Sequence, residues 1–383
     1  MRFPEFQGEW QEGRLSDIAD LSKGIGISKD QLSADGEPCI LYGELYTKYK
    51  SETIKEVISK TNIDNTKLVK SKANDVIIPC SGETAEEIAT ARCVLKDDIL
   101  LGGDLNIIRL HGYDGSFMSY QLNGKRKYDI AKVAQGVSVV HLYGEHLKNI
   151  KTINPSLNEQ KKIANLLSLL DERISTQNKI IEDLKKLKSA IIEIEYSPKT
   201  KTSSHIGDFI VQTSKRNKDN AIQTVLSISN RQGFIQQSEQ FENRCVASDD
   251  TSNYKIVERN DFAFNPARIN VGSIARLITF EKGIVSPMYI CFRTKGCATP
   301  EYLDYFFESK LFFTEIQKRL EGSVRQCLSY EGLCNIPLPL FSIAVQHKIG
   351  KQLFKLTQKI KLETDFLEIL HKQKQYLLRQ MFI

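Results

Sequence analysis

What this 383-residue sequence has little of narrows the kinds of protein that it can be. No apolar run approaches the ~18 residues that span a bilayer, and the first residues form no apolar signal segment. The 8 cysteines are scattered, and none belongs to a Cys-x-x-Cys pair, so a disulfide scaffold is not expected. We therefore expect a cytoplasmic protein with no membrane association.

Catalytic motifs are also missing. The sequence contains no G-x-x-x-x-G-K-[ST] loop, no G-x-S-x-G turn and no H-E-x-x-H helix. Gly24-Ile25-Gly26 lacks the third glycine of a dinucleotide fingerprint, so we interpret it as a turn. Asn265-Pro266-Ala267-Arg268 lacks the second proline and the aromatic residue that would hold a flipped adenine, so we interpret it as a turn that could face DNA. We expect no catalytic residue, no metal site and no cofactor in this chain.

The charge is mildly basic and unevenly distributed. Lys and Arg number 53 against 47 Asp and Glu, a net charge of +6. Residues 341–383 alone hold 8 basic and 3 acidic residues, a net charge of +5. A basic excess suits a polyanionic partner such as DNA, whereas a solvated helix face would give the same composition.

One sequence pattern returns at a fixed distance along the chain. Asn74-Asp75 resembles Asn260-Asp261, and 260 − 74 = 186. The segment 160–163 resembles 346–349, and 346 − 160 is again 186. Chance matches would scatter in offset, so the sequence predicts two copies of one unit, each a mixed domain followed by a long helix.

Each of the two long helices carries a narrow apolar stripe with alternating spacings of three and four. Polar residues interrupt the stripes at equivalent places, Gln177 and Lys188 in the first helix and Glu363 and Lys374 in the second. This spacing is typical of a coiled coil, although two ordinary helices in separate cores are the alternative. The predicted seam residues are Leu167, Leu170, Ile174, Ile181, Leu184 and Ile191, with Leu353, Leu356, Ile360, Leu367, Leu370 and Leu377.

Short β-branched segments and amphipathic segments precede each long helix. We expect strands at 75–78, 105–110 and 284–290, and helices at 115–133 and 301–320. The predicted fold class is α+β, with two tandem mixed domains and two long helices. The predicted boundaries are 1–154 for the first domain, 155–197 for the central helix, 198–338 for the second domain and 339–383 for the distal helix.

Basic and polar residues next to predicted turns are candidate DNA contacts. Arginine can bond guanine with two hydrogen bonds, asparagine can bond adenine, and lysine and serine suit phosphate. Ordinary solvent-exposed charge is the alternative for each residue taken alone. The predicted DNA-binding residues are Lys23, Tyr42, Ser81, Glu83, Lys125, Arg126, Lys127, Lys215, Arg216, Lys218, Arg231, Asn265, Arg268 and Arg325.

The segment that opens the first long helix resembles a known family. Residues 153–164, Ile-Asn-Pro-Ser-Leu-Asn-Glu-Gln-Lys-Lys-Ile-Ala, followed by 166–174, are close to a P-x-L-x-E-Q-x-x-I-A…L-x-x-L-D signature. That signature is typical of the specificity subunits of type I restriction–modification systems. The second copy departs from it, because Pro339 is shifted and Val345 replaces the glutamate. The resemblance covers nearly the whole chain.

The resemblance implies a non-catalytic subunit that reads a split, asymmetric site on double-stranded DNA. Each mixed domain would be a target-recognition domain, and the two helices would pack as an antiparallel coiled coil. Two methyltransferase subunits would supply S-adenosylmethionine, and two motor and nuclease subunits would use ATP and Mg. The 25-residue seam from Leu167 to Ile191 is about 36 Å long, comparable to a duplex turn of ~34 Å, so we expect two half-sites with a gap. A stand-alone DNA-binding regulator and a coiled-coil adaptor without catalytic partners are the alternatives.

Overall fold

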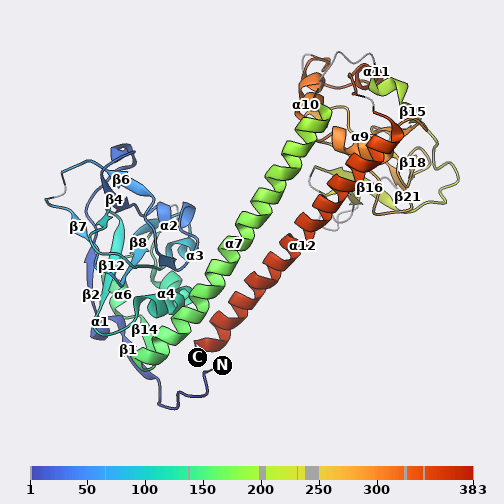
Figure 1. The fold of residues 1–383 in the computed structure, drawn as a ribbon. Helices are drawn as coiled ribbons and strands as arrows, with labels where there is room; N and C mark the ends of the chain where they lie inside the picture. Colours follow the sequence, from blue (N-terminus) through green and yellow to red (C-terminus); the bar gives the residue numbers. More distant parts are fainter. Residues whose placement is uncertain are drawn as a thin grey trace. The chain divides into compact units, whose positions relative to one another are not determined.

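The computed structural model describes residues 2–64, 66–136, 139–197, 204–230, 232–237, 250–322, 326–339 and 341–382. The chain divides into two compact units (Figure 1): unit 1 is Met1–Lys179 with Thr364–Ile383, and unit 2 is Ile180–Glu363. Helices α7 (Leu157–Tyr196) and α12 (Ile343–Met381) contribute residues to both units. Within the described ranges, none of the helices has the length and apolar character needed to cross a bilayer.

Unit 1 is built on two five-stranded sheets. The first has the order β2 (Ala19–Lys23), β12 (Leu105–Leu110), β8 (Asp75–Pro79), β10 (Arg92–Val94) and β5 (Thr53–Ile54). The second has the order β3 (Leu32–Ser33), β6 (Ser59–Thr61), β4 (Glu37–Ile40), β11 (Leu100–Leu101) and β7 (Val69–Lys70). Two small pairs complete it, β1 (Gln11–Arg14) with β14 (Lys151–Asn154) and β9 (Ser81–Gly82) with β13 (Val140–His141).

Short helices cover these sheets. They are α1 (Leu15–Ile18), α2 (Glu44–Thr47), α3 (Ala85–Ile88), α4 (Gly115–Asn123), α5 (Lys127–Val133) and α6 (Gly144–Lys148), with a 3-10 turn at Lys29–Gln31. Strand β12 is buried on both faces: Ile108 packs under the helices, and Ile107 packs in the core that contains β4 and β11. This explains why its residues are a nearly continuous apolar run rather than an alternating one.

Unit 2 is built on two four-stranded sheets. One has the order β15 (Ile210–Thr213), β22 (Ile290–Thr294), β19 (Phe262–Phe264) and β20 (Ile274–Arg276). The other has the order β17 (Gly233–Gln236), β16 (Val225–Ser229), β21 (Lys282–Val285) and β18 (Lys255–Glu258). The helices are α9 (Pro300–Phe306), α10 (Lys310–Gln317) and α11 (Tyr330–Cys334), with 3-10 turns at Ile206–Asp208 and Ile269–Val271. Phenylalanine dominates this core, which includes Phe262, Phe292, Phe306 and Phe312.

Equivalent ion pairs in the two units confirm the internal repeat. At the start of β8, buried Asp75 accepts a hydrogen bond of 2.7 Å from Arg109 on β12. One residue before β19, buried Asp261 accepts one of 2.9 Å from Arg293 on β22. The same aspartate–arginine pair therefore holds the same two neighbouring strands in each copy.

A buried glutamine joins each mixed domain to its long helix. The Oε1 atom of Gln160 accepts the backbone N–H of Asp114, which caps α4, at 2.9 Å. The Oε1 atom of Gln346 likewise accepts the N–H of Thr299, which caps α9, at 2.9 Å. Each glutamine also donates Nε2 to the carbonyl five residues before it. The repeated Gln-x-x-Ile motif thus marks the point at which each domain is attached.

The long helices pack antiparallel in both units, as expected. In unit 1, Leu167 near the start of α7 packs with Met381 and Phe382 at the end of α12. In unit 2, Tyr196 at the end of α7 packs with Leu353 near the start of α12. This arrangement, together with the mixed domains, confirms the predicted fold class.

All of the predicted seam positions lose solvent exposure. Leu167, Leu170, Ile174, Ile181, Leu353 and Leu370 are buried, while Leu184, Ile191, Leu356, Ile360, Leu367 and Leu377 are half-buried. Near the end of α7 the more deeply buried residues are Ile192 and Tyr196 rather than Ile191. The stripe drifts because a straight helix with 3.6 residues per turn does not keep a spacing of 3.5.

Each of two predicted long helices is in fact a pair of shorter helices. The segment 115–133 forms α4 and α5, which are separated at Gly124, and the segment 301–320 lies in α9 and α10. Ser309 starts α10 by accepting the backbone N–H of Phe312 on its hydroxyl at 3.2 Å. The apolar periodicity continues across both breaks, which is why it indicated single helices.

The predicted strand 284–290 is also wrong. Strand β21 ends at Val285 and β22 begins at Ile290, with a turn between them in which Tyr289 N–H donates to the Ser286 carbonyl at 3.1 Å. Pro287 lacks the backbone donor that a central strand requires, so the apolar run turns there.

Candidate nucleic-acid interface

One end of the sheet β15-β22-β19-β20 brings together segments that are far apart in the sequence. Strands β15 and β19 each pair antiparallel with β22, with Thr213 opposite Cys291 and Phe264 opposite Ile290. The chain after β15, the chain after β19 and the chain before β22 therefore meet at the same end of the sheet. The predicted DNA-binding residues Lys215, Arg216, Lys218, Asn265 and Arg268 all follow these strand ends.

The loop after β15 is held by one buried side chain. Asn217 is fully buried, and its amide donates to the Ile222 carbonyl at 2.9 Å and accepts the Ile222 N–H at 3.1 Å. Its backbone N–H bonds the Tyr254 carbonyl at 3.0 Å. The loop is thus fixed from inside, while Lys215 and Lys218 on either side of Asn217 point to solvent.

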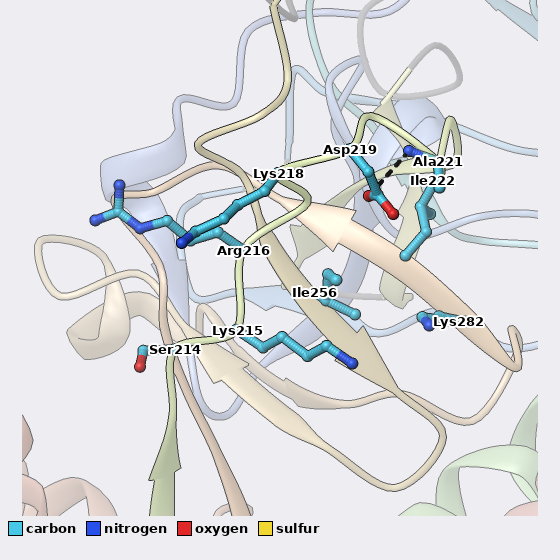
Figure 2. A pocket seen from close by; sticks show the side chains of 9 residues that line it. All are labelled: Ser214, Lys215, Arg216, Lys218, Asp219, Ala221, Ile222, Ile256 and Lys282. Carbon is cyan, nitrogen blue, oxygen red and sulfur yellow. Dashed lines mark hydrogen bonds between the residues drawn. The ribbon is translucent and has the colours of Figure 1, made fainter.

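This loop forms one wall of a basic pocket of about 620 Å³ (Figure 2). We use "basic pocket" for its four cationic residues, Lys215, Arg216, Lys218 and Lys282. The carboxylate of Asp219 also lines it, but accepts a hydrogen bond from Ala221 N–H at 3.3 Å (Figure 2). Ile222 and Ile256 give the pocket an apolar surface. The pocket as a whole suits an extended anion with apolar parts.

A second group, the "strand-end turn" of Asn265, Arg268 and Met288, lies beside it. The Oδ1 atom of Asn265 accepts the backbone N–H of Ala267 at 3.0 Å, and its Nδ2 atom lies 3.8 Å from Met288 Sδ. Arg268 is exposed, and Met288 is 60% exposed despite its apolar side chain. The turn expected at residues 265–268 is therefore present.

Contacts of Lys255 join the two groups. The Nζ atom of Lys255 donates to the Tyr289 carbonyl at 2.6 Å, next to Met288 in the chain. The backbone of Lys255 also pairs with that of Arg216 in an antiparallel bridge. The basic pocket and the strand-end turn thus form neighbouring parts of one surface.

Unit 1 presents different side chains at the equivalent strand ends. The Nζ atom of Lys23, at the end of β2, lies 5.5 Å from the centre of the Tyr143 ring. The Oγ atom of Ser81, after β8, lies 3.4 Å from Nδ1 of His141, whose ring stacks on Tyr143 at 6.2 Å between centroids. Tyr143 is 45% exposed, so a cation, a hydroxyl and two rings share this surface.

Sequence reasoning identified Lys23 and Ser81 but missed His141 and Tyr143 as their neighbours. The available signal was the alternation His141-Leu142-Tyr143, which places both rings on one face of an extended segment. Sequence alone does not reveal that this segment pairs with residues 81–82.

The remaining predicted residues have different surroundings. Tyr42 is exposed and leads into α2, whose Tyr46 hydroxyl donates to the Ser81 carbonyl at 3.1 Å. Glu83 is exposed just before the Thr84 cap of α3. Arg231 and Arg325 lie outside the described residues.

The turn at Lys125, Arg126 and Lys127 is not joined to the strand ends by the contacts described. It follows Gly124, which faces the backbone of Leu378 in α12. The Arg126 side chain is only 14% exposed and bonds Asp129 at 3.3 Å, whereas Lys125 is exposed. A role of this turn in DNA binding stays a prediction.

The described residues contain no group of three or more His, Cys, Asp or Glu that could hold a metal ion. The two strand ends offer cations, amides, hydroxyls and rings instead. These groups can bind phosphate and base edges.

Known proteins that are similar to this chain agree with the resemblance seen in the sequence. A family model described as the type I restriction modification DNA specificity domain matches residues 7–186. The matched segment is similar to that domain and makes up just under half of the 383 residues. The match confirms the resemblance seen in the sequence, because the signature at 153–174 falls within the matched residues.

One curated relative has a name that also describes a specificity subunit. The chain is 29% identical over 194 residues to the type I restriction enzyme MjaVIII specificity subunit of Methanocaldococcus jannaschii. That match spans 50% of this chain and 42% of the relative, so less than half of the relative's length is covered.

Solved structures support the fold over the whole chain. A type I restriction–modification S subunit from M. genitalium is 17% identical, with a TM-score of 0.64 and coverage of 100% of this chain and 97% of that one. A structure described as the basis of complex assembly and conformational transition of the type I R-M system is 13% identical, with a TM-score of 0.55 and coverage of 98% and 97%. At these identities the likeness shows the shared fold.

Proposed function

We propose that this chain is a non-catalytic DNA specificity subunit that recognises a split, asymmetric target on double-stranded DNA. The observation that carries the proposal is the repeated structure with different side chains at equivalent strand ends. Lys23, Ser81 and Tyr143 occupy this position in unit 1, and Asn265 and Arg268 occupy it in unit 2. The match of residues 7–186 to a DNA specificity domain supports it.

Two similar units with different surfaces can meet two different half-sites in equivalent ways. The phosphate backbone is the same at both half-sites, so a shared fold can bind it twice. Different side chains then read different base edges. We propose residues 1–154 and 198–338 as the two target-recognition domains, with helices at 155–197 and 339–383.

The proposed partners follow from the same function. A specificity subunit needs catalytic partners, and we propose two methyltransferase subunits that bring S-adenosylmethionine and two motor and nuclease subunits that use ATP and Mg. The names of the relatives, a restriction enzyme specificity subunit and a type I R-M assembly, support this proposal. The cytoplasm is the proposed location of the complex.

A domain exchange tests the function. Residues 201–335 would be replaced by the matching segment of a related chain, and adenine methylation would be mapped across the genome. One half-site should change while the other stays the same, because each domain reads its own half. A change in both half-sites would contradict independent reading. Methylation that is the same with and without the chain would favour a stand-alone regulator, and absence of salt-dependent DNA binding would favour an adaptor.

A further inference from the structure

We propose that the surface of unit 2 divides the work of DNA binding between its two neighbouring parts. The basic pocket binds the phosphodiester backbone, and the strand-end turn reads base edges. This inference rests on the proposed function and deepens it, because it separates the residues that set affinity from those that set sequence. It also adds Lys282 and Met288, which the sequence did not single out.

The charges of the basic pocket call for an anion from outside the protein. Among the described residues, no carboxylate bonds Lys215, Arg216 or Lys218; Arg216 donates to the neutral amide of Asn253 at 2.8 Å. Lys282 Nζ lies 3.8 Å from a carboxylate oxygen of Glu258, a long ion pair, and Asp219 is the carboxylate in the pocket lining. Four cations against this one lining carboxylate leave an excess of positive charge that a polyanion can neutralise, and a duplex presents a regular row of phosphates.

The rigidity of the pocket favours binding of the backbone. Asn217 holds the loop through both atoms of its amide, so the loop needs little ordering when DNA arrives. The apolar side chains of Ile222 and Ile256 give a surface for the sugar next to a bound phosphate (Figure 2). None of these groups distinguishes one base from another, so this part of the surface sets position and affinity.

The strand-end turn has the opposite character. The Oδ1 atom of Asn265 is engaged by Ala267 N–H, which fixes the amide and directs its Nδ2 donor toward Met288. Arg268 is exposed beside it, and a guanidinium can donate two hydrogen bonds to guanine. Met288 is 60% exposed, and a thymine methyl group is an apolar partner for such a side chain. An oriented donor, a guanidinium and an apolar contact are the set that base reading requires.

Salt dependence separates the two parts experimentally. The chain would be assembled with its methyltransferase partners, and its binding to a target duplex and to a random duplex would be measured from about 50 to 400 mM salt. Each of Lys215→Gln, Arg216→Gln, Lys218→Gln and Lys282→Gln should make the negative slope of the log association constant against log salt less steep by about 0.9, equally on both duplexes. The matched control is Lys348→Gln, an exposed lysine of α12, which should leave the slope unchanged.

Variants of the strand-end turn should change the DNA sequence that is recognised rather than the salt dependence of binding. Met288→Ala and Asn265→Ala should keep the salt slope on random DNA and change the methylated sequence in one half-site. Failure of wild type to bind DNA in a salt-dependent way would overturn the proposed function itself. Salt-dependent binding by wild type, with pocket variants that keep its slope or with turn variants that keep its methylated sequence, would overturn only the division of work.

Discussion

Lys374→Met should destabilise unit 1 strongly at neutral pH. The Nζ atom of Lys374 lies 2.6 Å from Glu52 Oε2 and 2.6 Å from Asp171 Oδ1, and these carboxylate side chains are only 8% and 7% exposed. The Tyr120 hydroxyl donates to the other oxygen of Asp171 at 2.7 Å. Removing the cation leaves two buried carboxylates without their ion-pair partner, and buried Arg92 then supplies the remaining positive charge that acts on both. Breaking a buried pair in this way costs about 3–5 kcal/mol.

The loss should depend on pH in a defined direction. Burial raises the pKa of Glu52. Burial alone would also raise the pKa of Asp171, but the charge and hydrogen bond of Lys374 lower that pKa overall. Without Lys374, burial dominates for both carboxyl groups, so both pKa values lie above those of the unfolded chain. Such groups contribute stability at low pH that is lost as the pH rises through the folded pKa. The destabilisation should therefore be largest near pH 8 and smaller near pH 5.

The single tryptophan of the chain supplies the assay. Trp10 lies in unit 1, with its ring 6.2 Å from that of Phe117 in the cluster that packs on α7 and α12. Urea unfolding would be followed by its fluorescence at several pH values. The control is Lys188→Met, the equivalent lysine in α7. It pairs with Glu308 of unit 2, so the Trp10 transition of unit 1 should not move.

Neutralising the partners tests the stated cause. Adding Glu52→Gln and Asp171→Asn to Lys374→Met should recover much of the lost stability, since neither buried carboxylate charge then remains. Buried Arg92 keeps its hydrogen bonds to the carbonyls of Tyr49 and Ala91. A single variant that loses under about 1 kcal/mol at pH 8, or one that weakens further on acidification, would refute the reasoning. A triple variant no more stable than the single one would do the same.

Three further changes test the helices, the domain attachment and the predicted interface. Leu370→Ala, at a side chain that is 2% exposed, should cost about 2–5 kcal/mol in the Trp10 assay, while the neighbouring Ile369→Ala, 59% exposed, should cost under about 0.5 kcal/mol; equal losses would contradict the packing. Gln160→Ala should cost about 1–3 kcal/mol in the same assay, because the Asp114 N–H loses its acceptor, and an unchanged transition would contradict the attachment. Lys125→Gln should make the negative slope of the log association constant for DNA against log salt less steep by about 0.9. An unchanged slope would show that this turn does not contact DNA.

Local patterns predicted the parts of the fold that local forces determine. The strand at 105–110 matches β12, because a short β-branched run between glycines has few other stable arrangements. Ser156 and Glu159 have the spacing of a capping box at the start of α7, but the structure forms only half of that box. Ser156 Oγ accepts Glu159 N–H at 3.4 Å, but the Glu159 carboxylate bonds Arg2 at 2.7 Å instead of closing the box. A charged partner from the beginning of the chain outweighed the local bond, and sequence spacing cannot reveal such a partner.

The candidate site shows the same division. Turn residues and cations predicted the individual positions Lys215, Arg216 and Asn265, because their chemistry is local. Lys282 belongs to the same pocket only because β21 and β18 pair. Met288 reaches Asn265 only because the chain turns at Pro287, between β21 and β22. Pairing between strands that are far apart in the sequence depends on the packing of the whole core. The local sequence pattern therefore could not predict which strands pair.

The discontinuous make-up of unit 1 has a consequence for the order in which the chain folds during synthesis. Unit 2 is one continuous segment, and all of its core residues have been synthesised once Glu363 has been added. Unit 1 contains residues from both ends, and Leu370, Lys374, Met381 and Phe382 fill its helix-packing clusters. Unit 1 therefore cannot complete its core until the last residues of the chain have been synthesised, and the apolar surface that packs on them stays exposed until then. Contacts between residues more than 200 positions apart in the sequence also form slowly. A chain truncated shortly after residue 363 would therefore contain every residue of unit 2 and lack part of unit 1.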